Sequence, residues 1–454
     1  MGENFQIQLI EKNLKTTTNT YTLNRFVKPS QILDLVSQYG TPMYLIDENI
    51  LHFKANELLN AYGKYKEPKR IAYSVKANFI PAILRSFMKD GITFDLTSLG
   101  ELYFLKKCKI ESENLIYTSI TEEEEEEYVQ VLRNGITKVV VSSFNGMTNL
   151  VKAAAKTNVQ PETLIRINPE VGVKAEIRAS YKNGKFGVPF NGGTIDSAFK
   201  IVKHIVNNEF LNFDGFHFHL GSQITNFSCY SNTFSKLDSF ISRIKKDIPS
   251  FTINTIDIGG GTHVFYNQPV PTPKQMAENY ITKLNKLVDD HGVFELIIES
   301  GRFLVAESAI LLSRIVNMKE YNGHKIVIVD AGYHVLLDSA LMKQEYPQEV
   351  IDSNNTTIYS RNSGLSPKNI HVTGRLCDTY DVFPLSEGSN LNNARIGNYI
   401  SFYNVGAYSV VFNMPFHCQT KPPIVMKTSS GDFKLVRKGT TYENLFEEEG
   451  GSLS

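Results

Sequence analysis

Lys76 is the residue whose surroundings most clearly suggest chemistry. It stands in the stretch Ala-Tyr-Ser-Val-Lys-Ala-Asn at residues 72–78, where an apolar strand-like run ends and a helix-like run begins. A lysine at such a strand end can form a Schiff base with an aldehyde cofactor. A solvated surface charge is the alternative for a single lysine, so other residues have to support the chemistry.

A glycine triplet and an acidic segment follow two other strand-like runs. The triplet at residues 259–261 would let backbone N–H groups approach a phosphate without obstruction by side chains, although it can also be a tight turn. Glu299 follows the run at residues 296–298, and a carboxylate at a buried strand end needs a partner. A pyridinium N–H is a suitable partner, and a structural ion pair with Arg302 is the alternative.

Short β-branched runs alternate with helix-like stretches between residues 42 and 308. This alternation predicts an α/β protein with a parallel sheet and crossover helices, and the count and length favour a (β/α)8 barrel over a doubly wound sheet. In such a barrel the carboxyl ends of the strands face one mouth, so the residues described above would converge there. The runs lie at residues 43–46, 71–75, 139–141, 164–167, 213–219, 253–258 and 296–298.

His217 and His219 alternate with phenylalanines in the segment 216–223, at the end of one of these runs. We expect one of His217 and His219 to face the barrel interior and the other to face the layer of helices. That arrangement disfavours a shared metal ion and leaves ring stacking or core packing for these side chains. We therefore expect no metal site.

The pattern changes after residue 308 to short strands with little helix between them. We expect four parts: a lead-in at 1–41 that joins the β-rich domain, the barrel at 42–308, the β-rich C-terminal domain at 309–446 and a disordered tail at 447–454. The six acids at residues 122–127 are expected to begin a surface helix, whose positive N-terminal end they favour, rather than to bind a cation.

Composition and charge exclude several classes of protein. Among the 454 residues, 47 lysines and arginines balance 47 aspartates and glutamates. We therefore expect neither a nucleic acid nor a membrane surface as a partner, and we expect a small-molecule ligand. No apolar run reaches the roughly 20 residues that span a bilayer. The spacing of the four cysteines indicates neither a disulfide framework nor a metal-binding CxxC motif. No targeting segment is evident, so we expect a cytoplasmic protein.

An ordered set of motifs extends over about residues 40–440: Lys76 in YSVKAN, Asp95 in FDLTS, KFG at 185–187, His219 in HLGSQ, the glycine triplet, ESGR at 299–302, Cys377 and Asp378 in GRLCDTYDVF, and Tyr408 in GAY. This set resembles the fold-type III pyridoxal-phosphate decarboxylases, and within them the diaminopimelate decarboxylases most closely. The resemblance implies a TIM-like barrel of the alanine-racemase type with a C-terminal β-rich domain.

The resemblance also implies roles for the barrel residues. Lys76 would bind pyridoxal 5'-phosphate covalently, His219 would stack on its ring, and Glu299 would pair with its ring nitrogen. Asp95 and Arg166 would tune Lys76 and the surroundings of the ring. The cofactor's phosphate would be held by Ser222, Gly259, Gly260, Gly261, Gly301 and Tyr408, and Arg302 would contact cofactor and substrate.

Catalysis and assembly follow from the same resemblance. The substrate amine would displace Lys76, CO2 would leave as electrons pass into the ring, and Cys377 would return a proton to Cα. In this family the segment with Cys377 and Asp378 reaches the active site of the other subunit, which implies a homodimer. A buried structural thiol is the alternative for Cys377.

The residues that read the substrate depart from the diaminopimelate pattern. Asp338 stands where these enzymes usually carry arginine, which reverses the sign of a recognition charge, and Met342 replaces a tyrosine. Arg375 is a candidate replacement for the lost cation. Asp378 matches the ornithine-type enzymes and would accept hydrogen bonds from a distal ammonium.

We therefore expect an amino-acid α-decarboxylase. Its leading substrate is meso-diaminopimelate, and the alternatives are ornithine, lysine or a modified or scaffold-attached amino acid. A racemase on the same barrel is disfavoured by the Cys377-Asp378 segment. A catalytically silent regulatory homologue is disfavoured because Lys76, Glu299 and Cys377 are all present.

Overall fold

The structure is a computed structural model, and its described residues form two compact units. One unit comprises residues 1–47, 265–269 and 309–454, and the other comprises residues 48–264 and 270–308. Within the described ranges, no helix is long and apolar enough to cross a membrane. The described residues are 20–22, 28–118, 120, 123–175, 177–192, 195–267, 269–351, 358–360, 369–386, 389, 391 and 394–451.

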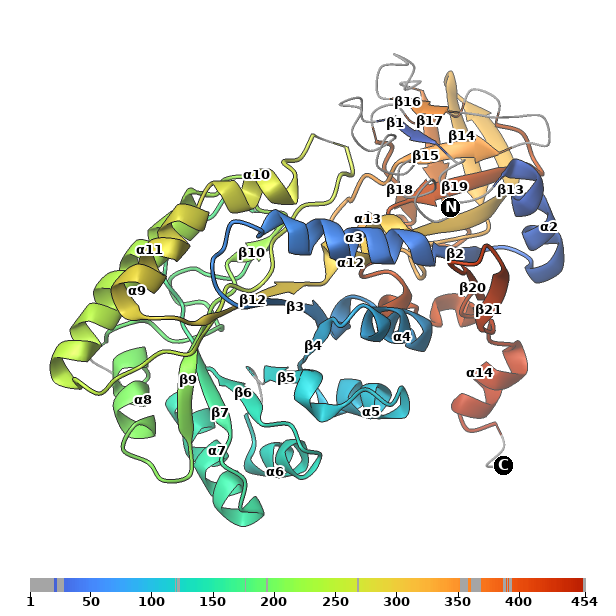
Figure 1. The fold of residues 1–454 in the computed structure, drawn as a ribbon. Helices are drawn as coiled ribbons and strands as arrows, with labels where there is room; N and C mark the ends of the chain where they lie inside the picture. The colour runs from blue at the N-terminus through green and yellow to red at the C-terminus, as the bar shows by residue number, and fades with distance from the viewer. Residues whose placement is uncertain are drawn as a thin grey trace. The chain divides into compact units, whose positions relative to one another are not determined.

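Eight parallel strands close into a barrel in the second unit, which confirms the predicted (β/α)8 fold (Figure 1). Around the barrel the strands follow the order β11-β12-β3-β4-β5-β6-β7-β9. A small antiparallel pair, β8 (Ile177–Arg178) with β10 (Gly221–Ser222), lies outside the closed barrel. The barrel strands are β3 (Lys69–Ser74), β4 (Thr93–Leu96), β5 (Leu115–Thr118), β6 (Lys138–Val141), β7 (Glu162–Arg166), β9 (Asn212–His217), β11 (Thr255–Asp257) and β12 (Glu295–Ser300).

Helices surround these strands (Figure 1). Two of them begin at serines that lie two residues after the end of a strand: Ser98 Oγ accepts the N–H of Glu101, and Ser143 Oγ accepts the N–H of Gly146. Each cap fixes where the chain turns from strand to helix at the barrel mouth. The helices are α3 (Glu48–Ala61), α4 (Pro81–Lys89), α5 (Leu99–Lys107), α6 (Glu125–Arg133), α7 (Phe144–Thr157), α8 (Ala198–Ile205), α9 (Ser228–Asp247), α10 (Pro273–Glu278), α11 (Ile281–His291) and α12 (Arg302–Val305).

The barrel interior is built in layers, as alternation along parallel strands requires. The middle layer is apolar and consists of Ala72, Ile116, Val140, Leu164 and Ile297. Residues two positions further along three of these strands are polar: Thr118, Arg166 and Glu299. The apolar layer therefore separates a polar upper layer at the mouth from the floor of the barrel.

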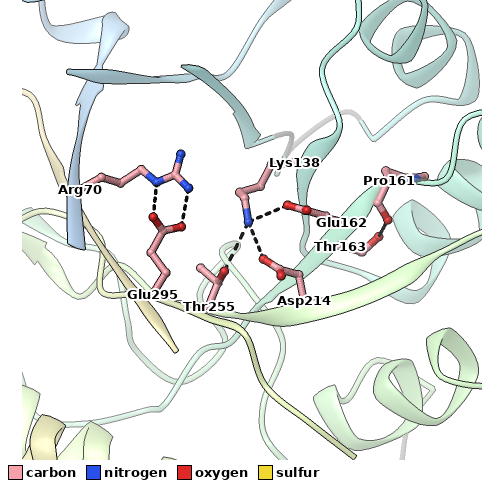
Figure 2. Close-up of polar contacts among 8 residues, drawn as sticks. All are labelled: Arg70, Lys138, Pro161, Glu162, Thr163, Asp214, Thr255 and Glu295. Carbon is pink, nitrogen blue, oxygen red and sulfur yellow. Dashed lines mark hydrogen bonds and ion pairs between the residues drawn. The ribbon is translucent and has the colours of Figure 1, made fainter. Parts of the chain in front are cut away.

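The floor is closed by ion pairs, which Figure 2 shows. Arg70 Nε donates to Glu295 Oε1 at 2.6 Å. Lys138 Nζ lies 2.6 Å from Asp214 Oδ2 and 2.8 Å from Glu162 Oε2. The first pair links the amino-terminal ends of β3 and β12, and Lys138 links that of β6 to those of β7 and β9.

Replacing Lys138 with methionine should lower the free energy of unfolding by about 3 kcal/mol, because the buried Asp214 carboxylate would lose its partner. Urea unfolding measures this change. The double variant Lys138→Met/Asp214→Asn should recover part of the loss, since it leaves no unpaired charge. Equal stabilities of the single variant and the wild type would contradict the assignment.

The first unit is rich in strands, as the sequence predicted (Figure 1). Its main sheet has nine strands, and the long β13 pairs with β14, β2 and β19. The elements of this unit are β1 (Thr20–Thr22), α2 (Pro29–Tyr39), β2 (Met43–Asp47), β13 (Ala309–Tyr321), β14 (His324–Val329), α13 (Asp338–Leu341), β15 (Gln348–Ile351), β16 (Ile358–Ser360), β17 (Ile370–Thr373), β18 (Val382–Phe383), β19 (Tyr399–Tyr403), β20 (Ile424–Lys427), β21 (Phe433–Arg437) and α14 (Tyr442–Glu448).

Three details differ from the sequence expectations. Strand β2 pairs with β13 and β20 and is not a barrel strand, although we expected the barrel to begin at residue 42. Helix α6 does begin within the acidic run, but Glu123 is buried and its carboxylate accepts the N–H of Ser142. Helix α14 extends to Glu448, into the segment expected to be disordered, because Thr441 caps its start; residues 452–454 lie outside the described residues.

Candidate active site

Lys76 and Asp95 lie at the ends of neighbouring barrel strands. Lys76 is in the short 3-10 turn η2 (Val75–Ala77) that directly follows β3, and its side chain is exposed. Asp95 is buried on β4, and its Oδ1 accepts the Thr118 hydroxyl at 2.6 Å. Burial and the Glu299 carboxylate raise the pKa of Asp95 to about 6, while the Lys76 ammonium acts in the opposite direction. The positive charge of Lys76 therefore acts on the Asp95 carboxyl, and the predicted role of Asp95 at the cofactor remains a prediction.

Glu299 and Arg166 supply opposite charges to the same upper layer. Both are buried, with 4% and 5% of their surface exposed. Burial raises the pKa of Glu299, and the cations Lys76 and Arg166 oppose this rise. Burial also lowers the pKa of Arg166 to about 10. The Arg166 guanidinium lies over the ring of Phe186, 4.8 Å from its centroid, so the KFG motif holds it in place.

The glycine triplet needs glycine at its first and third positions. Gly259 has φ of +63°, and a Cβ there would lie 2.4 Å from the carbonyl oxygen of Phe218. Gly261 has φ of +128°, and a Cβ there would lie 2.7 Å from the Tyr230 hydroxyl. Both the backbone conformation and the lack of space exclude a side chain. The triplet is therefore a close-packed turn between β11 and the mouth.

Two N–H groups of the triplet already have acceptors. Gly259 N–H donates to Asp257 Oδ1 at 2.8 Å, and Gly260 N–H donates to His219 Nδ1 at 3.0 Å. These bonds fix the triplet and the His219 ring, so the expectation that the triplet binds phosphate now rests on Gly261. Burial, followed by the charges of Arg166 and Lys76, lowers the pKa of His219 well below its usual range.

Ser222 and Arg302 lie together at the mouth. Ser222 is in β10, and Arg302 begins α12 directly after Gly301. Arg302 Nε approaches Ser222 Oγ at 3.4 Å. Arg302 is 6% exposed, so its guanidinium is available mainly to groups within the barrel mouth.

The expectation that His217 and His219 face opposite sides of the barrel wall is wrong. Side chains two residues apart on a strand share a face, so His217 and His219 cannot point to opposite sides of the barrel wall. The structure places His217 in the upper layer, with its Nε2 3.2 Å from Glu299 Oε1. Strand parity is the signal that would have identified His217 as a site residue.

Tyr230 is a second residue that the sequence analysis missed. Its hydroxyl donates to the carbonyl oxygen of Gly260 at 2.8 Å, and its ring stacks on Tyr280 with centroids 4.8 Å apart. On helix α9 it follows the spacing of an ordinary core residue, so no sequence signal distinguishes it. In the structure its hydrogen bond to Gly260 stabilises the backbone of the glycine triplet.

Replacing Tyr230 with phenylalanine should weaken binding of pyridoxal phosphate about two- to tenfold, because one hydrogen bond that fixes the triplet is lost. Equilibrium dialysis of the cofactor measures the dissociation constant. Tyr65→Phe is the matched control, since the Tyr65 hydroxyl also donates to a backbone carbonyl, that of Phe294, at 2.8 Å. Equal changes in both variants would contradict a role for Tyr230 at the site.

The remaining predicted residues belong to the other unit. Cys377 is exposed. Asp378 is oriented by two donors, the Tyr333 hydroxyl at 3.0 Å and the N–H of Tyr380 at 2.8 Å. Arg375 is exposed, two residues before Cys377. The roles of these residues at the cofactor remain predictions.

Asp338 and Tyr408 also lie in that unit. Asp338 begins α13 and is only 4% exposed, which weighs against direct contact between its carboxylate and a substrate. Tyr408 adopts a left-handed backbone conformation with φ of +55°, which is uncommon for a tyrosine. Its predicted contact with the phosphate remains a prediction.

The barrel residues fit pyridoxal phosphate. The buried carboxylate of Glu299, whose Oε1 has no hydrogen-bond partner among the described residues, suits a protonated ring nitrogen. Lys76 at the strand end suits the aldehyde. Gly261 in the close-packed turn and the guanidinium of Arg302 suit a phosphate.

Comparison with known proteins agrees with this chemistry. Residues 52–306 match the family model described as "Pyridoxal-dependent decarboxylase, pyridoxal binding domain". Diaminopimelate decarboxylase of Methanocaldococcus jannaschii is 27% identical over 432 residues, which cover 93% of this chain and 94% of that protein. The crystal structure of this decarboxylase with L-lysine has a TM-score of 0.79, at 25% identity and with 92% and 94% of the two chains covered.

A more distant structure shares the fold. Lysine/ornithine decarboxylase from Vibrio vulnificus, solved with putrescine, has a TM-score of 0.72 at 21% identity, with 88% of this chain and 97% of that chain covered.

The closed barrel and its mouth define a pyridoxal-phosphate enzyme. The chain belongs to the family of pyridoxal-dependent decarboxylases, whose cofactor-binding domain covers more than half of it. It is a pyridoxal-phosphate-dependent amino-acid decarboxylase that resembles diaminopimelate decarboxylase. The predicted fold, enzyme class and cofactor are thereby confirmed.

Proposed function

We propose that this decarboxylase acts on an amino acid whose distal end carries charged groups, with meso-diaminopimelate as the leading substrate. One observation supports this choice most directly: Arg375 and Asp378 offer opposite charges on either side of the exposed Cys377. The distal end of diaminopimelate is itself an amino acid, with an ammonium and a carboxylate. Arg375 would bind the carboxylate and Asp378 the ammonium.

The barrel residues would hold the cofactor and the substrate. When bound, pyridoxal phosphate supplies an electron-accepting ring that stabilises the negative charge left at Cα when CO2 departs. Lys76 would anchor the aldehyde and, once displaced by the substrate amine, hold and move protons at the mouth. Glu299 would bind the ring nitrogen, and His219, fixed by the N–H of Gly260, would stack on the ring.

The other unit would complete the site from a second copy of the chain. Cys377 would return the proton to Cα, and a homodimer would bring it to the barrel of the partner. The exposure of large side chains next to this segment supports such an interface, since Tyr380 is 71% and Phe416 is 41% exposed. We also propose a cytoplasmic protein, supported by its four unpaired cysteines.

A diamine acid such as ornithine or lysine is the second candidate. Asp378, held by the Tyr333 hydroxyl, would bind a distal ammonium equally well in the absence of a distal carboxylate. Asp338, which replaces the arginine usual in diaminopimelate enzymes, favours this candidate by its charge, although its burial argues against direct contact. A modified or scaffold-attached amino acid is the third candidate.

The substrate is identified by CO2 release from cofactor-loaded protein. The panel contains meso-diaminopimelate, both enantiomers of lysine, ornithine and arginine, and glutamate, with Lys76→Ala as the blank. We expect turnover of meso-diaminopimelate that is strongly reduced by Arg375→Ala, because the distal carboxylate would lose its cation. Turnover of ornithine or lysine alone would contradict the leading proposal and support the second candidate. No CO2 release from any amino acid of the panel would support the third candidate, a modified or scaffold-attached amino acid.

A further inference from the structure

His217, Asp257 and Glu299 form a buried polar cluster in the upper layer of the barrel. Nitrogen or oxygen atoms of the three side chains all lie within 4.8 Å of one another. His217 and Asp257 are fully buried, and Glu299 is 4% exposed. Nε2 of His217 and Oε1 of Glu299 are 3.2 Å apart but not aligned as a hydrogen bond, and Oδ2 of Asp257 also has no partner among the described residues. Buried polar atoms are normally paired, so the cluster indicates bonds that form in the working site.

The strands hold these side chains in fixed positions. Asp257 lies directly opposite His217 in the register of β11 and β9. Asp257 Oδ1 accepts the N–H of Gly259 at 2.8 Å, which leaves Oδ2 for the cluster. The apolar layer that contains Ile297 lies two residues below Glu299. The cluster therefore cannot relax toward the floor, and its groups have to satisfy one another.

The charges around the cluster decide where its proton sits. It faces the cations Lys76 and Arg166, the carboxylate of Asp95 and the neutral ring of His219. Burial, followed by the charge of Arg166, lowers the pKa of His217 well below its usual range, so this ring is neutral at pH 7.

Asp257 is the carboxyl group of the cluster whose surroundings favour the protonated form. Burial and the Glu299 carboxylate raise the pKa of Asp257 well above its usual range. Two buried carboxyl groups this close share one proton, because ionising both is costly. The charges of Lys76 and Arg166 oppose the rise in the pKa of Glu299, which favours Glu299 as the carboxyl group that ionises.

We propose that His217 is a positioning residue that donates its Nε2–H to Glu299 Oε1 while Asp257 holds the cluster's proton, so that Glu299 is the ionised carboxylate available to the cofactor's ring nitrogen. This inference rests on the proposed pairing of Glu299 with that nitrogen. Without the imidazole, Glu299 would share the proton of Asp257 directly. The ring nitrogen would then lose its proton more readily, and the ring would become a weaker electron acceptor.

Nitrogen NMR of the loaded enzyme tests this inference without relying on turnover. Pyridoxal phosphate labelled with 15N in the ring is bound to the wild type and to His217→Leu, His217→Gln and His204→Leu. Glutamine can place an N–H close to the position of Nε2, and leucine cannot. His204 is an exposed histidine on α8 and serves as the control.

We expect the ring nitrogen to be protonated at pH 7 in the wild type and in His204→Leu. In His217→Leu its signal should move toward the unprotonated position, and kcat should fall about tenfold or more with a smaller change in KM, because a hydrogen bond to a charged group is lost. His217→Gln should restore most of the signal. If His217→Leu does not fold, His217→Asn replaces it, since its side chain is too short to reach Oε1.

An unchanged signal in His217→Leu would overturn the inference. Glu299→Gln tests the proposed pairing of Glu299 with the ring nitrogen separately. If the 15N signal changes in Glu299→Gln but not in His217→Leu, the pairing holds and only the role of His217 fails. If the signal changes in neither variant, the pairing itself is contradicted. Zinc alone, added to cofactor-free protein, tests the competing assignment. One tightly bound zinc ion per chain that His217→Leu abolishes would assign the cluster to a metal and overturn the proposal.

Discussion

Replacing Lys76 with alanine is expected to lower the rate of CO2 release by about 10³-fold or more, because Lys76 combines covalent attachment of the cofactor with proton transfer. The lysine lies in the turn that follows β3, and its charge acts on Asp95, His217, His219 and Glu299. Cofactor that is bound to the variant should be removable by dialysis. The rate is measured with protein saturated with pyridoxal phosphate, so that a change in affinity does not contribute.

Lys107→Ala is the matched control, since Lys107 is the exposed last residue of α5. It should leave the rate within about twofold, as surface substitutions usually do. A small primary amine added to Lys76→Ala should restore part of the activity by replacing the missing amino group. A Lys76→Ala enzyme with more than a tenth of the wild-type rate would contradict the role of this lysine.

Replacing Glu349 with glutamine is expected to make the protein more stable at high pH. Glu349 is fully buried on β15, where its Oε2 accepts the Tyr403 hydroxyl at 2.7 Å and its Oε1 has no partner among the described residues. Burial raises the pKa of this carboxyl to about 8. The folded protein therefore keeps a proton that the unfolded chain releases near its usual pKa of about 4.3.

The sign of the effect follows from this difference. Between about pH 4.3 and 8 the folded state binds more protons than the unfolded state, so the free energy of unfolding falls as pH rises. Above pH 8, ionisation of Glu349 should have lowered the free energy of unfolding by roughly 3–5 kcal/mol. Glu349→Gln has no group to ionise there and should not show this decrease. Urea unfolding at pH 6 and pH 9 measures the difference between the two proteins.

Glu320→Gln is the control for this experiment, since Glu320 is an exposed residue of β13 in the same sheet. It should show the same dependence on pH as the wild type. Equal loss of stability between pH 6 and 9 in Glu349→Gln and the wild type would show that Glu349 is ionised in the folded protein at neutral pH, contrary to the expectation.

The barrel could be predicted because its strands and helices alternate along the chain, but individual strands depended on contacts that the sequence does not display. Strand β2 is a buried run of five residues that resembles a barrel strand, and its partners β13 and β20 lie more than 250 residues further along. Strands β4 and β5 are four residues long and carry the inward polar residues Asp95 and Thr118. Their polar positions hid them from a search for apolar runs.

The site could be predicted where a residue type signals chemistry and not where it signals packing. Lys76, Glu299 and the glycine triplet stand out at strand ends, and the structure places them at one mouth. His217 required correct strand parity, and Tyr230 required the knowledge that α9 packs behind the triplet. Neither the burial of Asp338 nor the acceptors of the Gly259 and Gly260 N–H groups can be read from the sequence.

The most direct test of the account is to locate the cofactor on the chain. The protein loaded with pyridoxal phosphate is reduced with borohydride, digested and analysed by mass spectrometry, in parallel with a CO2 assay of the same sample before reduction. We predict one pyridoxyl group per chain, on the peptide that contains Lys76, together with loss of CO2 release after reduction. A pyridoxyl group on another lysine, or activity that survives complete modification of Lys76, would contradict the account.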